Sequence, residues 1–254
     1  MTRTLKQFIY GTGYAALLFL IAFGIWNGTL KEPATCTDGI RNQNEIAVDC
    51  GGSCVSCIIK DLMPLRETGE PRVLSLTDGR AVALFEVRNP NTTHHANSFS
   101  YDIVVRDLNK VKLESFSGTD TLFAGETRML FEPKMSARAN NIGSIELSFR
   151  DPEWRAADEF VPPSLTLSGI ITEKDGGTVR VSGTVRNESA LIAREPRVLA
   201  IVYDQFGYEL FASQTKLTAV GGFTEVPFSV PFPQDEGLAG LVDGAATKVF
   251  VYSR

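Results

Sequence analysis

The clearest chemical signal in this sequence is a group of four cysteines. All four lie in one stretch, at Cys36, Cys50, Cys54 and Cys57, and the other residues include none. Cysteines this close together either form disulfides or bind a metal such as zinc, for which Cys54 and Cys57 have half of a ligand pattern. The second pair of the usual zinc pattern is missing, and the location predicted below is an oxidising one. We therefore predict two disulfides, with three connectivities left open, and no metal.

The cysteine stretch resembles a short motif that recurs near the membrane in bacterial surface proteins. The motif reads Cys-x-Asp-Gly-x-x-Asn-x-x-Glu-x-x-x-Asp-Cys-Gly-Gly-x-Cys-x-x-Cys and matches Cys36 to Cys57. The resemblance implies a secreted or surface setting and no chemistry. Four further side chains of the motif carry oxygens that calcium could use: Asp38, Asn42, Glu45 and Asp49. Their spacing is not that of an EF-hand loop, and the glycines are explained as turns, so calcium stays an open alternative.

Little else in the sequence indicates catalysis. His94 and His95 are the only histidines. Adjacent residues of an extended chain point to opposite sides, so we expect solvated loop residues here and no shared metal site. No nucleophile elbow, phosphate-binding loop or zinc-protease motif is present. We therefore expect no catalytic, cofactor-binding or metal-binding residues and no cofactor.

The N-terminal segment predicts where the rest of the chain lies relative to a membrane. An uncharged apolar run extends from Phe8 to Trp26 and follows Arg3 and Lys6. A helix needs about 20 apolar residues to cross a bilayer, so we predict a transmembrane helix over 8–28 that contacts the lipid bilayer. Positive charges before the helix favour a cytoplasmic N-terminus at 1–7 and an extracytoplasmic location for the rest. A cleaved signal peptide is the alternative, although the run is long and no Ala-x-Ala cleavage site follows it.

The sequence after the cysteines contains an internal repeat. Val87-Arg88-Asn89 matches Val185-Arg186-Asn187 at an offset of 98. Further matches fall at 97 and pair Asp107 with Asp204, Leu113 with Leu210, Gly125 with Gly222, and Phe131 with Phe228. Alternating apolar residues predict half-buried strands, at 80–87, 99–105, 178–185 and 197–203. A period near 100 residues with several short strands is the size of an immunoglobulin-like sandwich.

These features predict a mainly β chain. The predicted parts are a cytoplasmic N-terminus at 1–7, a transmembrane helix at 8–28, a cysteine-rich neck at 29–61, two immunoglobulin-like β-sandwich domains at 62–150 and 164–254, and a Pro-rich linker at 151–163. Charge and prolines should break any strand in that linker and make it semi-rigid. If the repeat preserves strand order, Val185 and Val202 should be buried like Val87 and Val105.

The second repeat also resembles a known domain family. Gly183 to Asn187, then Val198 to Asp204, then Gly207 to Leu210, and finally Gly221 to Phe228 are similar to the bacterial FxLyD-type domain and the late-embryogenesis sandwiches. Ala200 and Val202 replace the Phe and Leu of that motif, whereas Tyr203 and Asp204 match it. The resemblance implies an immunoglobulin-like sandwich and no active site.

The expected function is therefore non-catalytic. A net charge of -5 and the lack of a basic run argue against nucleic acid as a partner. We expect a single-pass protein of the cell membrane whose tandem sandwiches act outside the cytoplasm in surface interaction or as a spacer, with protein partners in the envelope. The alternatives are a structural subunit of an envelope assembly, such as a secretion or pilus-associated machine, and an envelope enzyme.

Overall fold

The computed structural model describes residues 2–30, 35–42 and 44–253. The chain divides into two compact units, Met1–Leu62 and Met63–Arg254. Each unit is described by itself. The first holds the apolar helix and the cysteines, and the second holds both sequence repeats.

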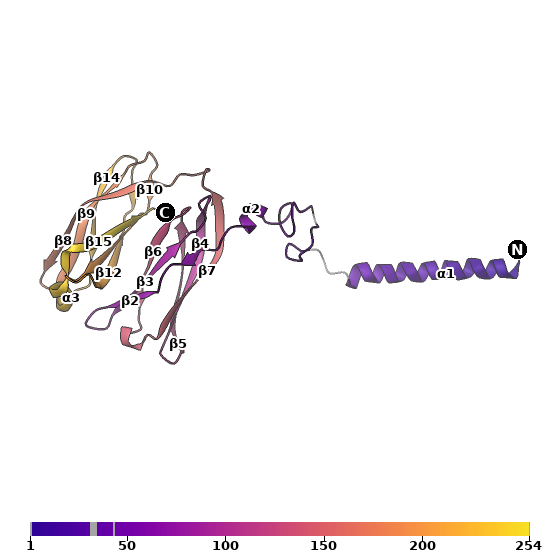
Figure 1. Ribbon diagram of the computed structural model, residues 1–254, viewed down its shortest axis with the longest axis horizontal. Coiled ribbons are helices and arrows are strands. Elements are labelled where there is room, and N and C mark those ends of the chain that lie inside the picture. Colours follow the sequence, from indigo (N-terminus) through magenta and orange to yellow (C-terminus); the bar gives the residue numbers. More distant parts are fainter. Residues whose placement is uncertain (1, 31–34, 43, 254) are drawn as a thin grey trace. The chain divides into compact units, whose positions relative to one another are not determined.

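The first unit begins with α1 (Arg3–Ile25), which continues through a single π-helical segment, η1 (Trp26–Leu30) (Figure 1). The candidate membrane span is Arg3–Gly28, with 26 residues and a mean hydropathy of 1.9. At 1.5 Å per residue it measures about 39 Å, enough to cross a hydrocarbon core of about 30 Å. By length and composition this helix can cross a membrane, and an N-terminal signal sequence would satisfy the same criteria. A short helix, α2 (Cys57–Lys60), follows the cysteine-rich stretch.

The second unit is built almost entirely of strands. The strands of the first repeat are β1 (Arg66–Glu67), β2 (Arg72–Ser75), β3 (Ala81–Arg88), β4 (His94–Arg106), β5 (Lys112–Leu122), β6 (Thr127–Met135) and β7 (Ser144–Ala156), with a 3-10 turn η2 (Ala139–Asn141). Those of the second repeat are β8 (Leu165–Asp175), β9 (Thr178–Asn187), β10 (Ala193–Arg194), β11 (Arg197–Tyr203), β12 (Glu209–Lys216), β13 (Ala219–Val220), β14 (Glu225–Pro231) and β15 (Asp243–Tyr252), with a short helix α3 (Glu236–Leu241). The mainly β class and the N-terminal apolar helix are confirmed.

The two repeats share one sheet topology. In the first repeat, β3 pairs with β1, β2 and β6, and a second sheet has the order β5-β4-β7. The second repeat has the corresponding orders β8-β9-β14 and β12-β11-β15, with a separate ribbon of β10 and β13. All of these pairings are antiparallel. Two sheets in each repeat fit a β-sandwich, as the sequence predicts.

The hydrogen bonds refine the alignment of the repeats. Asp107 Oδ1 accepts the N–H groups of Asn109 and Val111, and Asp204 Oδ1 accepts those of Phe206 and Tyr208, so the offset of 97 holds in this turn. In the sheets, Val87 pairs with Arg128 and Val185 with Val226, which requires an offset of 98 in both strands. The matches at 97 of Gly125 with Gly222, and of Phe131 with Phe228, are therefore wrong by one residue. Phe223 is the counterpart of Gly125, and Leu130 is the counterpart of Phe228.

The four sheets stack in layers (Figure 1). The sheet of β3 and the sheet of β11 lie in the middle, between the β4 sheet on one side and the β9 sheet on the other. Successive residues of β3 face different layers: Phe85 and Val87 belong to the core of the first repeat, whereas Val82 and Leu84 pack in the core of the second. The two repeats therefore bury apolar surface against each other.

This stacking corrects two expectations. β3 and β11 were predicted to be half-buried, yet β11 is buried at six of its seven positions and β3 at six of its eight. Burial on both faces removes the need for polar residues at alternate positions. The predicted valines are confirmed, since Val87, Val105, Val185 and Val202 are all fully buried.

The strand break predicted at 151–163 also needs correction. β7 continues to Ala156, pairing with β4 as far as His94. The register shifts between Ala96 and Ser100, and Asp151 takes a positive φ of 51°, so the chain absorbs Pro152 as a bulge at a sheet edge. Strand pairing ends only after Ala156.

Candidate functional site

The four predicted cysteines form two disulfides in the first unit. Cys36 bonds to Cys54 with Cα atoms 5.5 Å apart, and Cys50 bonds to Cys57 with Cα atoms 4.8 Å apart. Of the three possible connectivities, this one links the first cysteine to the third and the second to the fourth. The two bridges cross in sequence and close a small knot, defined here as residues 36–57. No free cysteine remains.

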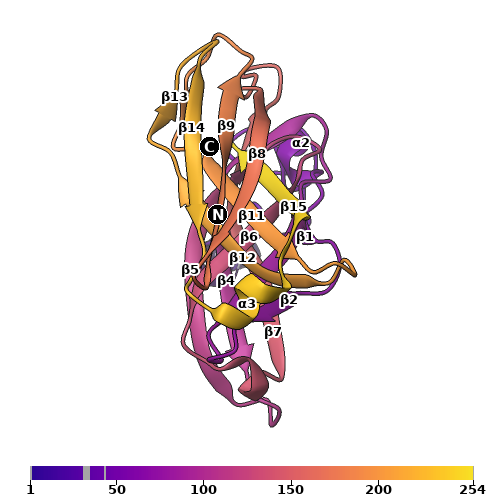
Figure 2. The same ribbon diagram turned by 90° about the vertical axis from the view of Figure 1, so that its left-hand side faces the viewer.

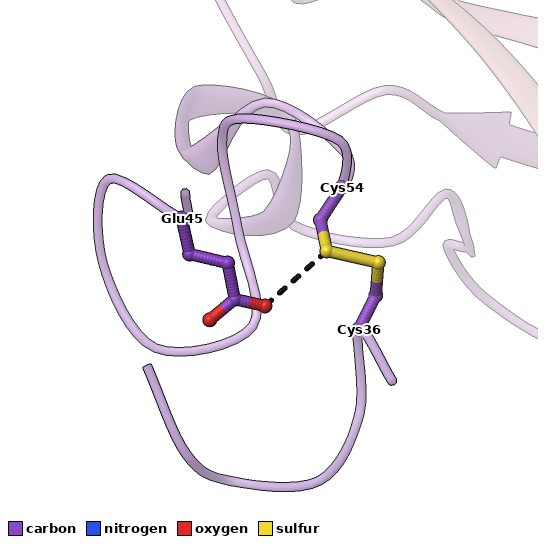
Figure 3. A group of neighbouring side chains, drawn as sticks. All are labelled: Cys36, Glu45 and Cys54. Carbon is purple, nitrogen blue, oxygen red and sulfur yellow. Dashed lines mark hydrogen bonds between the residues drawn. A yellow bond between two sulfur atoms is a disulfide. The ribbon is translucent and has the colours of Figure 1, made fainter. Parts of the chain in front are cut away.

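One carboxylate lies inside this knot. Oε1 of Glu45 is 3.2 Å from Sγ of Cys54, beside the bond to Cys36 (Figure 3). A disulfide sulfur has no thiol proton to donate and no thiolate charge, so this trio lacks the ligands that a metal draws from cysteine. The other oxygen, Oε2, accepts the backbone N–H groups of Asn42 at 3.2 Å and Asp49 at 3.1 Å. Glu45 is buried and acts as an internal cap for the turns around it.

The remaining candidate calcium ligands also hold backbone turns. The carboxylate of Asp38 accepts the side-chain amide of Asn42 and the backbone N–H groups of Ile40 and Thr35, and these bonds, in that order, lower its pKa. Oδ1 of Asp49 accepts the N–H of Gly39 at 2.9 Å. The arrangement explains these oxygens as structural acceptors. Among the described residues of the knot, Oδ1 of Asn42 alone is a buried side-chain acceptor without a partner.

Two glycines let the knot close. Gly51 and Gly52 have φ values of 79° and 61°. A Cβ on Gly52 would lie 2.4 Å from the backbone oxygen of Asn44, and one on Gly51 would lie 2.6 Å from the side chain of Ile46. Only glycine fits both positions, because they combine a left-handed backbone with a close approach.

The structure separates the two histidines, as the alternation of an extended chain predicts. Both belong to β4, and His95 is buried, which corrects the expectation of two solvated loop residues. Nδ1 of His95 accepts the N–H of Ala124 at 2.9 Å, so Nε2 carries the proton and donates to the carbonyl of Phe160 at 3.0 Å. Burial arises because the ring lies edge-on to Phe123 and Phe160. Both nitrogens therefore have structural partners.

A second polar cluster, not anticipated from the sequence, lies at the joint between the repeats. The joint is defined here as the facing surfaces of the β3 sheet and the β11 sheet, with their flanking side chains. Its apolar part consists of Leu74, Leu76, Val82 and Leu84 from the first repeat and of β11 residues such as Leu199 and Ile201 from the second.

Arginine and aspartate bridge one edge of the joint. Arg128 and Asp120 are each 3% exposed and lie 3.3 Å apart in the first repeat. The second oxygen of Asp120 is 2.9 Å from Arg197 of the second repeat, while Arg128 donates to the backbone carbonyl of Ser253 at 3.1 Å. The Arg128 guanidinium also stacks 5.0 Å from the ring centre of Tyr252. Each buried charge has an opposite charge beside it, which a dry interface requires.

Two further sets of polar contacts join the repeats elsewhere along the edges of this joint. Arg72 of the first repeat forms an ion pair with Glu209, which also accepts the hydroxyl of Tyr203 at 3.1 Å. Burial, and then the negative charge of Glu209, raise the pKa of Tyr203 to about 12. Asp235 caps α3 and accepts the hydroxyl of Thr77 at 2.6 Å, where Figure 2 shows α3 beside β2. The joint is thus apolar at its centre and hydrogen-bonded at its edges.

The sequence signal for this joint is a difference between the two repeats. Val82 and Leu84 on the outer face of β3 correspond to Arg180 and Ser182 on β9. Likewise, Leu199 on β11 corresponds to Asp102 on β4, whereas Ile201 corresponds to the apolar Val104 and shows no difference. One strand in each repeat therefore has an extra apolar face, which a comparison of the repeats position by position reveals.

A shallow hollow of about 540 Å³ lies at one end of the second repeat. Its lining residues come from the β10 and β13 region: Ile192, Arg194, Glu195, Thr218 and Ala219. A smaller hollow of about 260 Å³ lies at the joint, between residues such as Phe131 and Phe211. Neither brings together a nucleophile and a base among the described residues.

Comparisons with known proteins give no family assignment. No protein-family model matches the sequence, and no curated protein matches it. Among solved structures, two chains with 12% identity and a TM-score of 0.25 are an exo-chitosanase of Amycolatopsis orientalis and an inhibited exo-β-D-glucosaminidase. Each match covers 73% of this chain, which spans about a quarter, 26%, of those chains. A tandem CBM22 domain from Paenibacillus barcinonensis Xyn10C has 9% identity and a TM-score of 0.15, with 77% of this chain and 88% of that chain covered. Scores this low carry no functional argument.

Proposed function

We propose that this protein is a single-pass membrane protein that presents two joined β-sandwiches outside the cytoplasm for non-catalytic interaction. The helix at 8–28 is the anchor, the N-terminus at 1–7 is cytoplasmic, and the disulfide knot stands between membrane and sandwiches in the chain. Arg3 and Lys6 before the apolar run support this orientation. The disulfides support an oxidising compartment for the rest of the chain.

The joint between the repeats is the observation that carries the proposal. Two domains that merely follow one another in a chain move independently, whereas these share a core and a buried pair, Arg128 and Asp120. A presenting module benefits from this rigidity, because a surface held in a fixed orientation loses less entropy on binding. The engaged ring nitrogens of His95 support a role without acid–base catalysis.

Protease accessibility tests the orientation. A C-terminal tag on the full chain should be removed by protease added to spheroplasts, while a tag before Arg3 should stay intact until lysis. The protein should also remain in the membrane fraction after carbonate extraction, and its mass there should be that of the full-length chain. A protected C-terminal tag, or a mature protein that has lost residues 1–28, would contradict the anchor.

A structural subunit of an envelope assembly is the second candidate. One observation favours it: at Gly11, Gly13 and Gly24 of α1, apart from their chain neighbours and the helix's own backbone, no described atom lies within 4 Å of the place that a Cβ would take, so a partner helix could approach closely there. Cross-linking within the membrane followed by pull-down separates the two roles. Cross-links from α1 to other membrane helices favour the subunit, and cross-links from the sandwiches alone favour the presenting module. That the sandwiches are of the FxLyD type remains a proposal based on the resemblance.

A further inference from the structure

The first repeat covers the start of its β4 strand with a segment from further along the chain. The last residues of β7 pair with it, placing Trp154 opposite Ala96 and Arg155 opposite His95. The N–H of Ala157 then donates to the carbonyl of Thr93 at 2.9 Å. Beyond it, Phe160 packs against His95 and accepts its Nε2 proton. We call residues 153–160 the covering segment.

The second repeat has the same strand start without a described cover. Ala193 in β10 corresponds to Ala96, because Ala96 pairs with Leu122 and Ala193 with Val220 in the same register. Both alanines are fully buried. Ile192 then stands where His95 stands in the first repeat. In the part of the chain that the structure describes, β10 pairs with β13 alone, and its other edge has no strand beside it.

The hollow of about 540 Å³ lies at this uncovered strand, since Ile192 and Arg194 line it. Exposed apolar residues occur in this part of the second repeat: Ile192 lines the hollow, Leu191 precedes it in sequence, and Phe223 lies in the turn after β13. Leu191 is 46% exposed, Ile192 is 57% exposed and Phe223 is 68% exposed. Exposed apolar residues grouped in this way mark an interaction site.

The backbone at Phe223 supports the same interpretation. Its φ of 55° is rare for a residue with a bulky side chain, and the first repeat makes the same turn with Gly125 at a φ of 72°. The turn therefore needs no phenylalanine for folding. Phe223 thus combines a strained backbone with an exposed aromatic side chain in the turn after β13, the strand that pairs with β10, and a contact outside the fold would explain both.

We propose that the edge of β10 in the second repeat is a docking site for an extended peptide strand of a partner protein that carries a large apolar or aromatic residue. The partner strand pairs antiparallel with β10, as residues 153–156 pair with β4, and its apolar side chain enters the hollow beside Ile192, where Phe160 meets His95 in the first repeat. Backbone hydrogen bonds supply affinity, and the hollow selects the side chain. This proposal deepens the proposed interaction role and rests on it.

The covering segment itself provides a probe. A fluorescein-labelled peptide with the sequence of residues 151–162 carries Trp154, Arg155 and Phe160 in the spacing that the first repeat uses. Titration with the full chain in detergent, followed by fluorescence anisotropy, should show saturable binding. Hydrogen exchange should then show new protection at Ile192 and Arg194, because the N–H of Glu195 already donates to Thr218 of the fold and the alternate amides face the outer edge.

Matched variants localise the binding. Ile192→Asp should weaken the peptide at least tenfold, because it places a charge in the hollow. Ile171→Asp is the control, since Ile171 on β8 is 58% exposed and lies outside the hollow. A peptide with alanine in place of Phe160 should also bind at least tenfold more weakly.

Each remaining outcome counts against the docking site. The proposal fails if the peptide does not bind, if Ile192→Asp and Ile171→Asp behave alike, or if protection appears at residues 94–97 of the first repeat instead. A slower exchange at Ile192 when the chain is moved from detergent into phosphatidylcholine vesicles, lost in Ile192→Asp and kept in Ile171→Asp, would assign the patch to a lipid surface and also overturn the proposal. None of these results affects the protease test, so failure of this site and failure of the anchor are distinguishable.

Discussion

Asn89 and Asn187 occupy the same structural position in the two repeats, 98 residues apart. The Nδ2 group of Asn89 donates to the carbonyl of Leu122, and that of Asn187 donates to the carbonyl of Val220, both at 3.2 Å. Each Oδ1 accepts a backbone N–H two residues later, at 3.0 Å. Both side chains are fully buried. Asn187 begins a glycosylation sequon, yet its amide is buried and already donates to two backbone carbonyls, so it is not presented for glycan attachment.

Replacing Asn187 should destabilise the second unit strongly. Asn187→Ala removes the donor to the carbonyls of Leu191 and Val220 and the acceptor of the Ser189 N–H, and a buried polar group left without a partner costs about 1–3 kcal/mol. We expect the free energy of unfolding to fall by about 2–4 kcal/mol, measured by urea denaturation. Asn109→Ala, at an exposed turn, is the control and should change it by less than about 1 kcal/mol. Equal effects of the two variants would contradict the assigned role.

The buried ion pair at the joint should matter far more than an exposed one. Arg128→Met removes the cation beside Asp120 and Glu126, and breaking a buried pair costs about 3–5 kcal/mol. Arg150→Met breaks the pair with Asp102, in which the arginine is 55% exposed, and should cost less than about 1 kcal/mol. Chemical denaturation of both variants measures the difference. A smaller loss for Arg128→Met than for Arg150→Met would show that the joint does not depend on this charge.

The shared core predicts that the repeats unfold together. Leu84→Ala in the first repeat removes a fully buried side chain from the core of the second, at a cost of about 2–5 kcal/mol. Calorimetry should show one transition for residues 63–254, shifted to lower temperature by this substitution and also by Val202→Ala. Two separate transitions, with only one shifted by Leu84→Ala, would mean that the sandwiches are independent.

Asp235 should make the joint sensitive to acid. The hydroxyl of Thr77 and then the N–H of Leu238 lower the pKa of Asp235 below its usual value. Its contribution to stability is therefore present above the unfolded pKa, about 3.9, and is lost as the pH falls through the lower folded pKa. Denaturation from pH 7 down to pH 2 should show this loss in the wild type. Thr77→Val should make the loss of unfolding free energy at low pH smaller, because it removes one of the hydrogen bonds that lower the pKa of Asp235. If Asp235→Asn lost as much stability at low pH as the wild type, Asp235 would be excluded as the source of the loss.

Reduction should affect only the knot. Its residues carry both disulfides, and residues 63–254 contain no cysteine. Alkylation of the intact chain should add no mass before reduction and four alkyl groups after it. Reduction should also speed hydrogen exchange at residues 36–57, because a segment this small cannot bury enough apolar surface to hold its fold. The melting temperature of the second unit should stay the same. Alkylation of unreduced protein would disprove the pairing.

The sequence by itself determined the features that depend on local pattern. The run from Phe8 to Trp26 predicts the apolar helix, because helix length and hydropathy are properties of contiguous residues. The bounds of β11 agree with the prediction over Arg197 to Tyr203, since alternation and β-branching set strand tendency. The clustered cysteines predicted two disulfides, but connectivity depends on which Cα atoms the turns bring together, so it required the tertiary structure.

Only the tertiary structure decided how the repeats meet. Leu199 and Ile201 fit equally well as core of one sandwich or as contact surface for another, because hydrophobicity has no direction. The ion pair between Asp120 and Arg197 joins residues from separate repeats, and no local sequence pattern predicts it. The extension of β7 past Pro152 likewise depended on an edge position and a bulge, which the neighbouring β4 strand provides. Local sequence sets which elements form, and the burial of their second faces is settled only when distant strands pack together.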